Sequence, residues 1–165
     1  AGNLAVSGTT TLSDNIVFGA SGKGVHLGVT TATASNLVDD FEEGTFNLTM
    51  VGGSGSPSST QTLASEYVKV GKLVTFRTFQ SGVNNTGASG HIYFSGVPFT
   101  PTGVCIVNID INGQGTFSEG TPTGYLSGNI IYINQIRSNL GYNTVTHNVV
   151  SSAEWSLTGH FFTNS

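Results

Sequence analysis

The segment EYVKVGKLVTFRTF, residues 66–79, predicts the fold class of this chain. Hydrophobic and polar residues alternate on both sides of Gly71-Lys72, as they do in strands with one buried face. Glycine at the first position of a two-residue turn is typical of a type II′ hairpin. Val74 and Phe76 would face a core, whereas Thr75 and Arg77 would face water. The segment therefore indicates an antiparallel β-hairpin.

Four other segments have a similar pattern: HIYFSGVPF (91–99), GVCIVNIDI (103–111), NIIYINQI (129–136) and EWSLTGHFF (154–162). NIIYINQI is almost continuously apolar, which favours a central strand. Helical periodicity is hard to find anywhere, and turn residues separate the segments. The chain is therefore predicted to be all-β, with an antiparallel β-sandwich head that resembles a jelly roll. We expect six core residues from this pattern: Val74, Phe76, Ile131, Ile133, Trp155 and Leu157. Cys105 is expected to be a small buried hydrophobic residue.

Composition limits the possible functions. Charged residues make up 8% of the chain, against roughly 25% in ordinary globular proteins. Twenty-three glycines accompany ten phenylalanines, so a core is available. A net charge of -4 with five dispersed basic residues argues against nucleic-acid binding. No apolar run reaches the ~20 residues of a membrane helix, so we expect no membrane insertion. Such a polar but weakly charged surface is typical of extracellular and virion β-proteins.

The N-terminal segment differs from the rest. Residues 1–38 contain glycine, threonine and a few scattered apolar residues, which are too few for a core in one chain: Leu4, Val6, Leu12, Ile16 and Val17. Strands that cannot bury themselves normally pair with other chains. Three chains wound around a shared axis would bury these residues. Residues 1–38 are therefore predicted to be a short intertwined trimeric shaft or attachment segment, and residues 39–165 the head.

Four of the nine carboxylates lie between Asp39 and Glu43, at the boundary between these parts. Neighbouring carboxylates on a strand point to opposite faces, so Glu42 and Glu43 make a poor glycosidase pair. Asp40 and Glu42 could share a face, but no aromatic sugar platform is recognisable beside them. The segment also lacks the ligand spacing of an EF-hand. Three copies around an axis could still hold a cation, and that alternative stays open.

The preferred interpretation is a charged collar at the trimer junction, formed by Asp39, Asp40, Phe41, Glu42 and Glu43. Its carboxylates would face solvent or meet Lys69, Lys72 or Arg77, while Phe41 points the opposite way into a small apolar plug. Exposed ion pairs contribute little, ~0–1 kcal/mol. The collar is therefore expected to be structural.

No other pattern predicts catalysis. Residues 21–24 resemble a phosphate-binding loop, but a Walker A motif would need glycine at Val17 and Ser or Thr at Gly24. The four histidines are far apart in sequence, and no G-x-S-x-G elbow occurs. Cys105 is the single cysteine, so it cannot form a disulfide within one chain. We expect no enzyme activity, no catalytic residue, no cofactor and no metal site.

Several segments carry a resemblance to one family. NLVDDFEEGTFNLTM (36–50) resembles the "LDDYEEGTWTPTL" junction of tail-fibre and related virion proteins of tailed bacteriophages. YVKVGKLVTF is similar to the "YTKIGNLVTV" hairpin of that family, HIYFSGVPFTP to its "ISGLPFTA" strand, and SLTGHFFTNS to its closing "ISGSYLT" strand. GNLAVSGTTTL and GKGVHLG resemble the shaft that precedes the junction. In this chain Thr45-Phe46-Asn47 replaces the usual aromatic-Thr-Pro continuation.

The resemblance implies a homotrimeric structural protein of the phage particle, exposed on the tail or outside the capsid. The expected function is that of the C-terminal part of a tail fibre that binds a host-surface glycan or protein. The alternative is a trimeric capsid decoration or head-fibre protein, held to other virion proteins by its N-terminal segment. Candidate recognition loops are residues 52–61, 81–90, 114–124 and 141–148.

Overall fold

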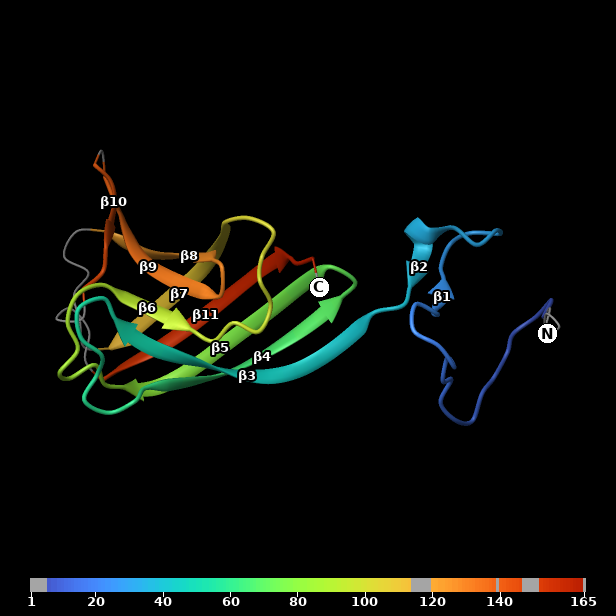
Figure 1. Ribbon diagram of the computed structural model, residues 1–165, viewed down its shortest axis with the longest axis horizontal. Coiled ribbons are helices and arrows are strands. Elements are labelled where there is room, and N and C mark those ends of the chain that lie inside the picture. Colours follow the sequence, from blue (N-terminus) through green and yellow to red (C-terminus); the bar gives the residue numbers. More distant parts are fainter. Residues whose placement is uncertain (1–5, 114–119, 139, 147–151, 165) are drawn as a thin grey trace. The chain divides into compact units, whose positions relative to one another are not determined.

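The computed structural model describes residues 6–113, 120–138, 140–146 and 152–164. The chain divides into two compact units, Ala1–Asp39 and Asp40–Ser165 (Figure 1). Regular structure in the described ranges consists of strands and one 3₁₀ turn, without an α-helix. None of the described helical structure is long and apolar enough to cross a membrane. The prediction of an all-β chain is confirmed.

The first unit contains little regular structure. Strand β1 (Val25–His26) pairs with β2 (Leu37–Val38) in antiparallel fashion, and the 3₁₀ turn η1 (Ala34–Asn36) precedes β2. The His26 Nδ1 lies 3.0 Å from the Thr33 carbonyl oxygen and helps to close the intervening loop. None of residues 6–39 is buried. This unit therefore has no core in a single chain.

The second unit is a closed antiparallel barrel with one additional strand (Figure 1). Its strands are β3 (Phe41–Gly52), β4 (Thr62–Val70), β5 (Leu73–Val83), β6 (Ile92–Ser95), β7 (Cys105–Gly113), β8 (Thr121–Ser127), β9 (Ile130–Arg137), β10 (Gly141–Thr144) and β11 (Ala153–Phe162). Around the barrel the order is β3-β4-β5-β11-β7-β8-β9-β6, and β6 returns to β3. The short strand β10 extends β9 on the edge that β6 leaves free. Residues 49–52 of β3 close the ring against β6, whereas residues 41–48 of β3 pair with β4 and not with β6.

The hairpin predicted from residues 66–79 is confirmed. Strands β4 and β5 pair from Ser65↔Thr78 to Val70↔Leu73 around Gly71-Lys72. Gly71 has a φ of +56°, whereas Lys72 does not have a positive φ. That combination is what a type II′ turn requires.

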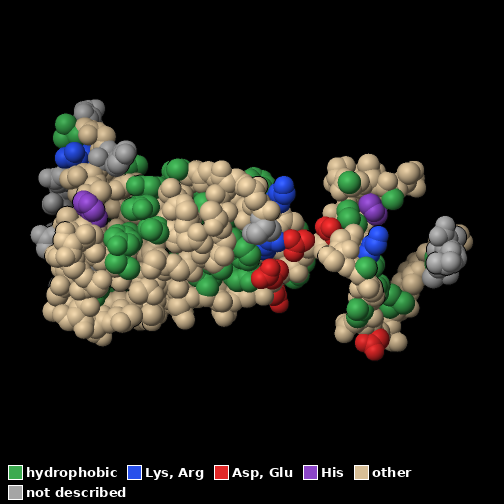
Figure 2. All heavy atoms as spheres, in the orientation of Figure 1, with side chains coloured by type: hydrophobic (Ala, Val, Ile, Leu, Met, Phe, Trp, Pro, Cys, Tyr) green, Lys and Arg blue, Asp and Glu red, His purple; other side chains and the backbone are tan. Residues whose placement is uncertain are grey.

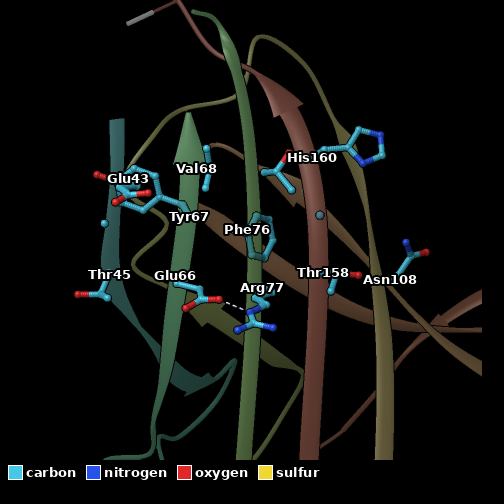
Figure 3. Close-up of a pocket in the computed structure, with 13 residues that line it drawn as sticks. Glu43, Thr45, Glu66, Tyr67, Val68, Phe76, Arg77, Asn108, Thr158 and His160 are labelled. Atoms are coloured by element: carbon cyan, nitrogen blue, oxygen red, sulfur yellow. Dashed lines mark hydrogen bonds and ion pairs between the residues drawn. The ribbon is translucent and has the colours of Figure 1, made fainter. Parts of the chain in front are cut away.

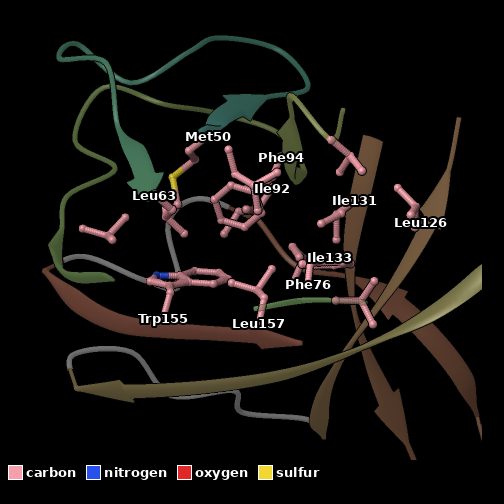
Figure 4. Packing of buried hydrophobic residues seen from close by; sticks show 14 of the residues in the cluster. Met50, Leu63, Phe76, Ile92, Phe94, Leu126, Ile131, Ile133, Trp155 and Leu157 are labelled. Carbon is pink, nitrogen blue, oxygen red and sulfur yellow. The ribbon is translucent and has the colours of Figure 1, made fainter. Parts of the chain in front are cut away.

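The interior of the barrel is filled by eighteen buried hydrophobic side chains drawn from nearly every strand (Figure 4). All six predicted core residues are among them. Trp155 is fully buried and packs edge-on against Phe94, with ring centroids 5.2 Å apart. Side chains from opposite walls of the barrel, such as Phe94 of β6 and Trp155 of β11, therefore pack against each other in the interior. This packing fits the sandwich-like head that was predicted. NIIYINQI is the predicted central strand, because β9 is paired on both edges.

Some expectations need correction. The strand expected in HIYFSGVPF is only β6, which ends at Ser95 before Gly96, whose φ is +111°. Cys105 is half-buried at the edge of the core, and partial burial raises the pKa of its thiol. Strands β8 and β10 were not predicted, because their sequences are short and rich in glycine, proline and hydroxyl residues.

Candidate functional site

The acidic segment lies at the start of the barrel. Residues Phe41, Glu42 and Glu43 are the first of β3 and pair with Val70, Lys69 and Val68 of β4. Because side chains alternate along a strand, Asp40 and Glu42 project toward the inner side of the barrel end, and Phe41 projects outward. Figure 2 shows carboxylates gathered at this end, beside a basic side chain.

Asp40 connects the start of β3 to β4 and to the β4–β5 turn. Its carboxylate forms an ion pair with the Lys69 ammonium group, one of the three basic partners expected from the sequence. The Lys69 side chain is only 4% exposed, whereas that of Asp40 is 45% exposed. The Lys69 Nζ also lies 5.9 Å from the centre of the Phe99 ring. The Gly71 amide donates a hydrogen bond of 2.7 Å to the Asp40 carbonyl oxygen, so the start of β3 is bound to the β4–β5 turn.

Glu42 is held by an aromatic neighbour. The Tyr67 hydroxyl donates a hydrogen bond to the Glu42 carboxylate. That hydrogen bond, together with desolvation and the negative charge of Glu42, raises the pKa of Tyr67. The Tyr67 ring meets Phe99 edge to face, with centroids 5.0 Å apart.

The remaining carboxylates of the segment, Asp39 and Glu43, are exposed. Neither makes a side-chain hydrogen bond or ion pair with the residues that the structure describes. No group of three or more metal-ligating side chains comes together among those residues either. The arrangement of Asp40 and Glu42 can fasten strands together. It does not bring two free carboxylates to one reaction centre.

An apolar row crosses the outer face at the same end. Phe41, Val70, Leu73 and Phe162 occupy successive positions on β3, β4, β5 and β11, since Phe41 pairs with Val70, Val70 with Leu73, and Leu73 with Phe162. These four side chains are between 39% and 64% exposed. We call them the apolar row. Contiguous exposed apolar side chains are typical of surfaces that contact another molecule.

A shallow groove of about 710 Å³ crosses the outer face beyond the apolar row (Figure 3). Five neighbouring strands, β3-β4-β5-β11-β7, contribute outward side chains at matching positions. The central line is Thr45, Glu66, Arg77, Thr158 and Asn108, which are paired in that order across the sheet. Glu66 and Arg77 form an ion pair in the middle of this line. We call this the polar groove.

The polar groove continues along the sheet. A second hollow of about 810 Å³ shares Thr45, Glu66, Arg77 and Thr158 with the first and extends to Phe79 on β5. Phe79 is 65% exposed, and its backbone position pairs with Ser156 of β11. The groove thus combines a line of polar groups with one exposed aromatic ring.

The sequence did not reveal the polar groove as a site. Glu66 and Arg77 were visible as polar positions of a hairpin, but Thr45 and Thr158 are more than a hundred residues apart. Their proximity depends on the pairing of β5 with β11. The only available signal was the alternation of polar residues along these strands. Any sheet with one face in water shows the same alternation, so it does not identify a site.

The four predicted loops are only partly loops. Residues 84–90 and most of 53–61 connect strands, but residues 81–83 belong to β5. In the third segment, Thr121 to Gly124 lie in β8, and residues 114–119 fall outside the described residues. In the fourth, residues 141–144 form β10, and residues 147 and 148 are likewise outside that part of the chain.

Comparison with known proteins does not assign the chain. No protein-family model matches it, and no curated protein matches its sequence.

Proposed function

We propose that this chain is a structural protein of a tailed bacteriophage and forms a homotrimeric fibre with a sandwich-like, jelly-roll-like head that binds the host cell surface. The observation that carries the proposal is the absence of any buried residue between positions 6 and 39. Nine large hydrophobic side chains of this unit are exposed in the single chain, from Val6 to Val38. Burial of apolar area at about 25 cal/mol per Å² is the main driving force for association. A unit of this kind becomes stable when other copies cover it.

The apolar row supports the same proposal. Phe41 follows Asp39 by two residues, so three copies joined through residues 1–38 would bring three apolar rows close to one another. Phe41 would then enter the apolar plug predicted at the junction, and Asp40 and Glu42 would keep their partners Lys69 and Tyr67. The collar of Asp39, Asp40, Phe41, Glu42 and Glu43 is therefore proposed as a joint between shaft and head. The sequence resemblance to phage virion proteins supplies the biological setting.

Light scattering on the full chain at micromolar concentration tests the oligomeric state, and we expect a mass of three chains. A single chain or a dimer would contradict the proposal. Antibody labelling of intact phage particles then tests the location by electron microscopy. Label at the tail supports a tail fibre, whereas label over the capsid shell would assign the chain to the decoration or head-fibre class.

A further inference from the structure

We propose that the polar groove is a binding site for a neutral oligosaccharide and that it is the receptor contact of the head. This inference rests on the proposed function, and it places recognition on the side of the barrel. The loops predicted from the sequence lie elsewhere.

The first support is the number of hydrogen-bonding groups left unused. Six polar side chains of the groove make no side-chain hydrogen bond with the described residues: Glu43, Thr45, Thr75, Asn108, Thr158 and His160. None of them is buried. Loop residues on the same unit behave differently, since Thr86 pairs with Asn84 and Thr100 with Asn129. The groove therefore presents an array of donors and acceptors at fixed positions on a paired sheet.

The ion pair at the centre adds directional recognition. Arg77 uses its Nε to reach Glu66, which leaves its two terminal nitrogens without a partner in the described part of the chain. The Arg77 side chain is 75% exposed and that of Glu66 is 53% exposed. A guanidinium group can donate to two adjacent hydroxyls, and a carboxylate can accept from two. Vicinal hydroxyls of a sugar ring match both groups.

The charged side chains of the groove favour neutral over anionic saccharides. The groove contains two carboxylates, Glu43 and Glu66, and one guanidinium group, Arg77, within a chain of net charge -4. An anionic glycan would meet repulsion at two positions and attraction at one. A neutral sugar is free of that penalty. Phe79, at the far end of the groove, offers an exposed ring against which the apolar face of a pyranose can pack.

Other occupants fit less well. An extended peptide binds a sheet by adding to a free edge, but the ion pair at the centre of the groove lies on β4 and β5, where Glu66 and Arg77 are paired on both sides. A second copy of the chain would require apolar anchors at the centre of its contact, and the central line from Thr45 to Asn108 has none. The apolar row is the surface that suits a second copy.

The experiment uses the full chain on an array of neutral and acidic oligosaccharides, followed by titration calorimetry with the best neutral ligand. Arg77→Ala and Glu66→Gln should each weaken binding about tenfold to a hundredfold, because each removes charge-assisted hydrogen bonds. Arg77→Lys should also lose affinity, since an ammonium group cannot replace the planar fork. Lys72→Ala removes one positive charge from an exposed position outside the groove and should bind like the wild type.

Three results would overturn the inference: no retained neutral saccharide, binding that the groove variants leave unchanged, or a changed oligomeric state in Arg77→Ala, which would make the groove a contact between copies. Light scattering on the wild type keeps the two proposals apart. A trimer that binds no saccharide contradicts only the groove. A monomer that binds saccharide through Arg77 contradicts only the fibre.

Discussion

Lys69 places an ammonium group inside the end of the barrel, where its side chain is only 4% exposed and Asp40 is its single carboxylate partner among the described residues. A charge so far removed from water is tolerated only when it is paired. The ion pair with Asp40 therefore holds the start of β3 against β4.

We therefore expect Asp40→Ala to destabilise the protein more than Lys69→Met. The first change leaves a buried ammonium group without its partner, at a cost of about 1–3 kcal/mol. The second replaces the charge by an apolar side chain of similar length. Chemical denaturation of both variants measures the difference. If Lys69→Met were the more damaging change, the ion pair itself would be a net source of stability.

Tyr67 predicts a dependence on alkaline pH. Its hydrogen bond to Glu42 raises the pKa of Tyr67 in the folded state. The unfolded chain therefore releases this proton first, so the contribution to stability is fully present below about pH 10 and is lost as the pH rises through the folded pKa. Glu42→Gln should shift the tyrosinate absorbance of Tyr67 to lower pH. It should change the stability at neutral pH by less than about 1 kcal/mol, as for other exposed groups. A titration curve identical to that of the wild type would contradict the role of Glu42.

At the scale of elements, the barrel depends on close packing of aromatic rings against glycines on neighbouring strands. Gly159 of β11 lies opposite Phe76 of β5, and Gly44 of β3 lies opposite Tyr67 of β4. A Cβ atom on Gly159 would come within 2.6 Å of the Phe76 ring, and one on Gly44 within 2.9 Å of the Tyr67 ring. The aromatic rings thus occupy the space that the two glycines leave.

Gly159→Ala should cost about 1–3 kcal/mol, as overpacking usually does, because Phe76 is 2% exposed and has no room to move. Gly44→Ala should cost less, since Tyr67 is only half-buried and its ring can shift toward solvent. Thermal melting of the two variants gives the comparison. Equal losses would mean that Tyr67 is held as firmly as Phe76.

The last strand should be essential to the core. Trp155 is fully buried, so Trp155→Ala should cost about 3–5 kcal/mol, which is a large part of the stability of a small domain. Trp155→Phe is the matched control, because it keeps an aromatic ring against Phe94. Melting of Trp155→Ala at the wild-type temperature would show that β11 is wrongly placed.

For the whole molecule, we expect the first unit to supply trimer stability and the barrel to fold without it. Removal of residues 1–35 deletes most of the exposed apolar side chains of the first unit but none of the barrel strands. The truncated chain should therefore lose trimer stability while its tertiary circular dichroism stays close to that of the full chain. Phe41→Ala in the full chain should lower the melting temperature in a concentration-dependent way. If the truncated chain stayed fully trimeric, the barrel alone would supply the interface.

What the sequence alone determined is local. Alternation with a period of two identified the β4–β5 hairpin and the inward side chains from Val74 to Leu157, because the pleat of a strand sends successive side chains to opposite faces. It was equally visible that the apolar residues of the first unit are too few and too scattered to form a core within one chain. The family resemblance, the trimer and the phage setting remain predictions.

The tertiary structure decided what depends on pairing between distant strands. Closure requires β8 against β9 and β11 between β5 and β7, and several arrangements of such strands would satisfy the same alternation. That register brings Thr45, Arg77 and Asn108 to one line on the outer face and sets Asp40 against Lys69. The line on the outer face has no signature in local sequence, and the sequence left Lys69 as one of three candidate partners of the acidic segment. Register decides both, and it is fixed by the packing of the whole barrel.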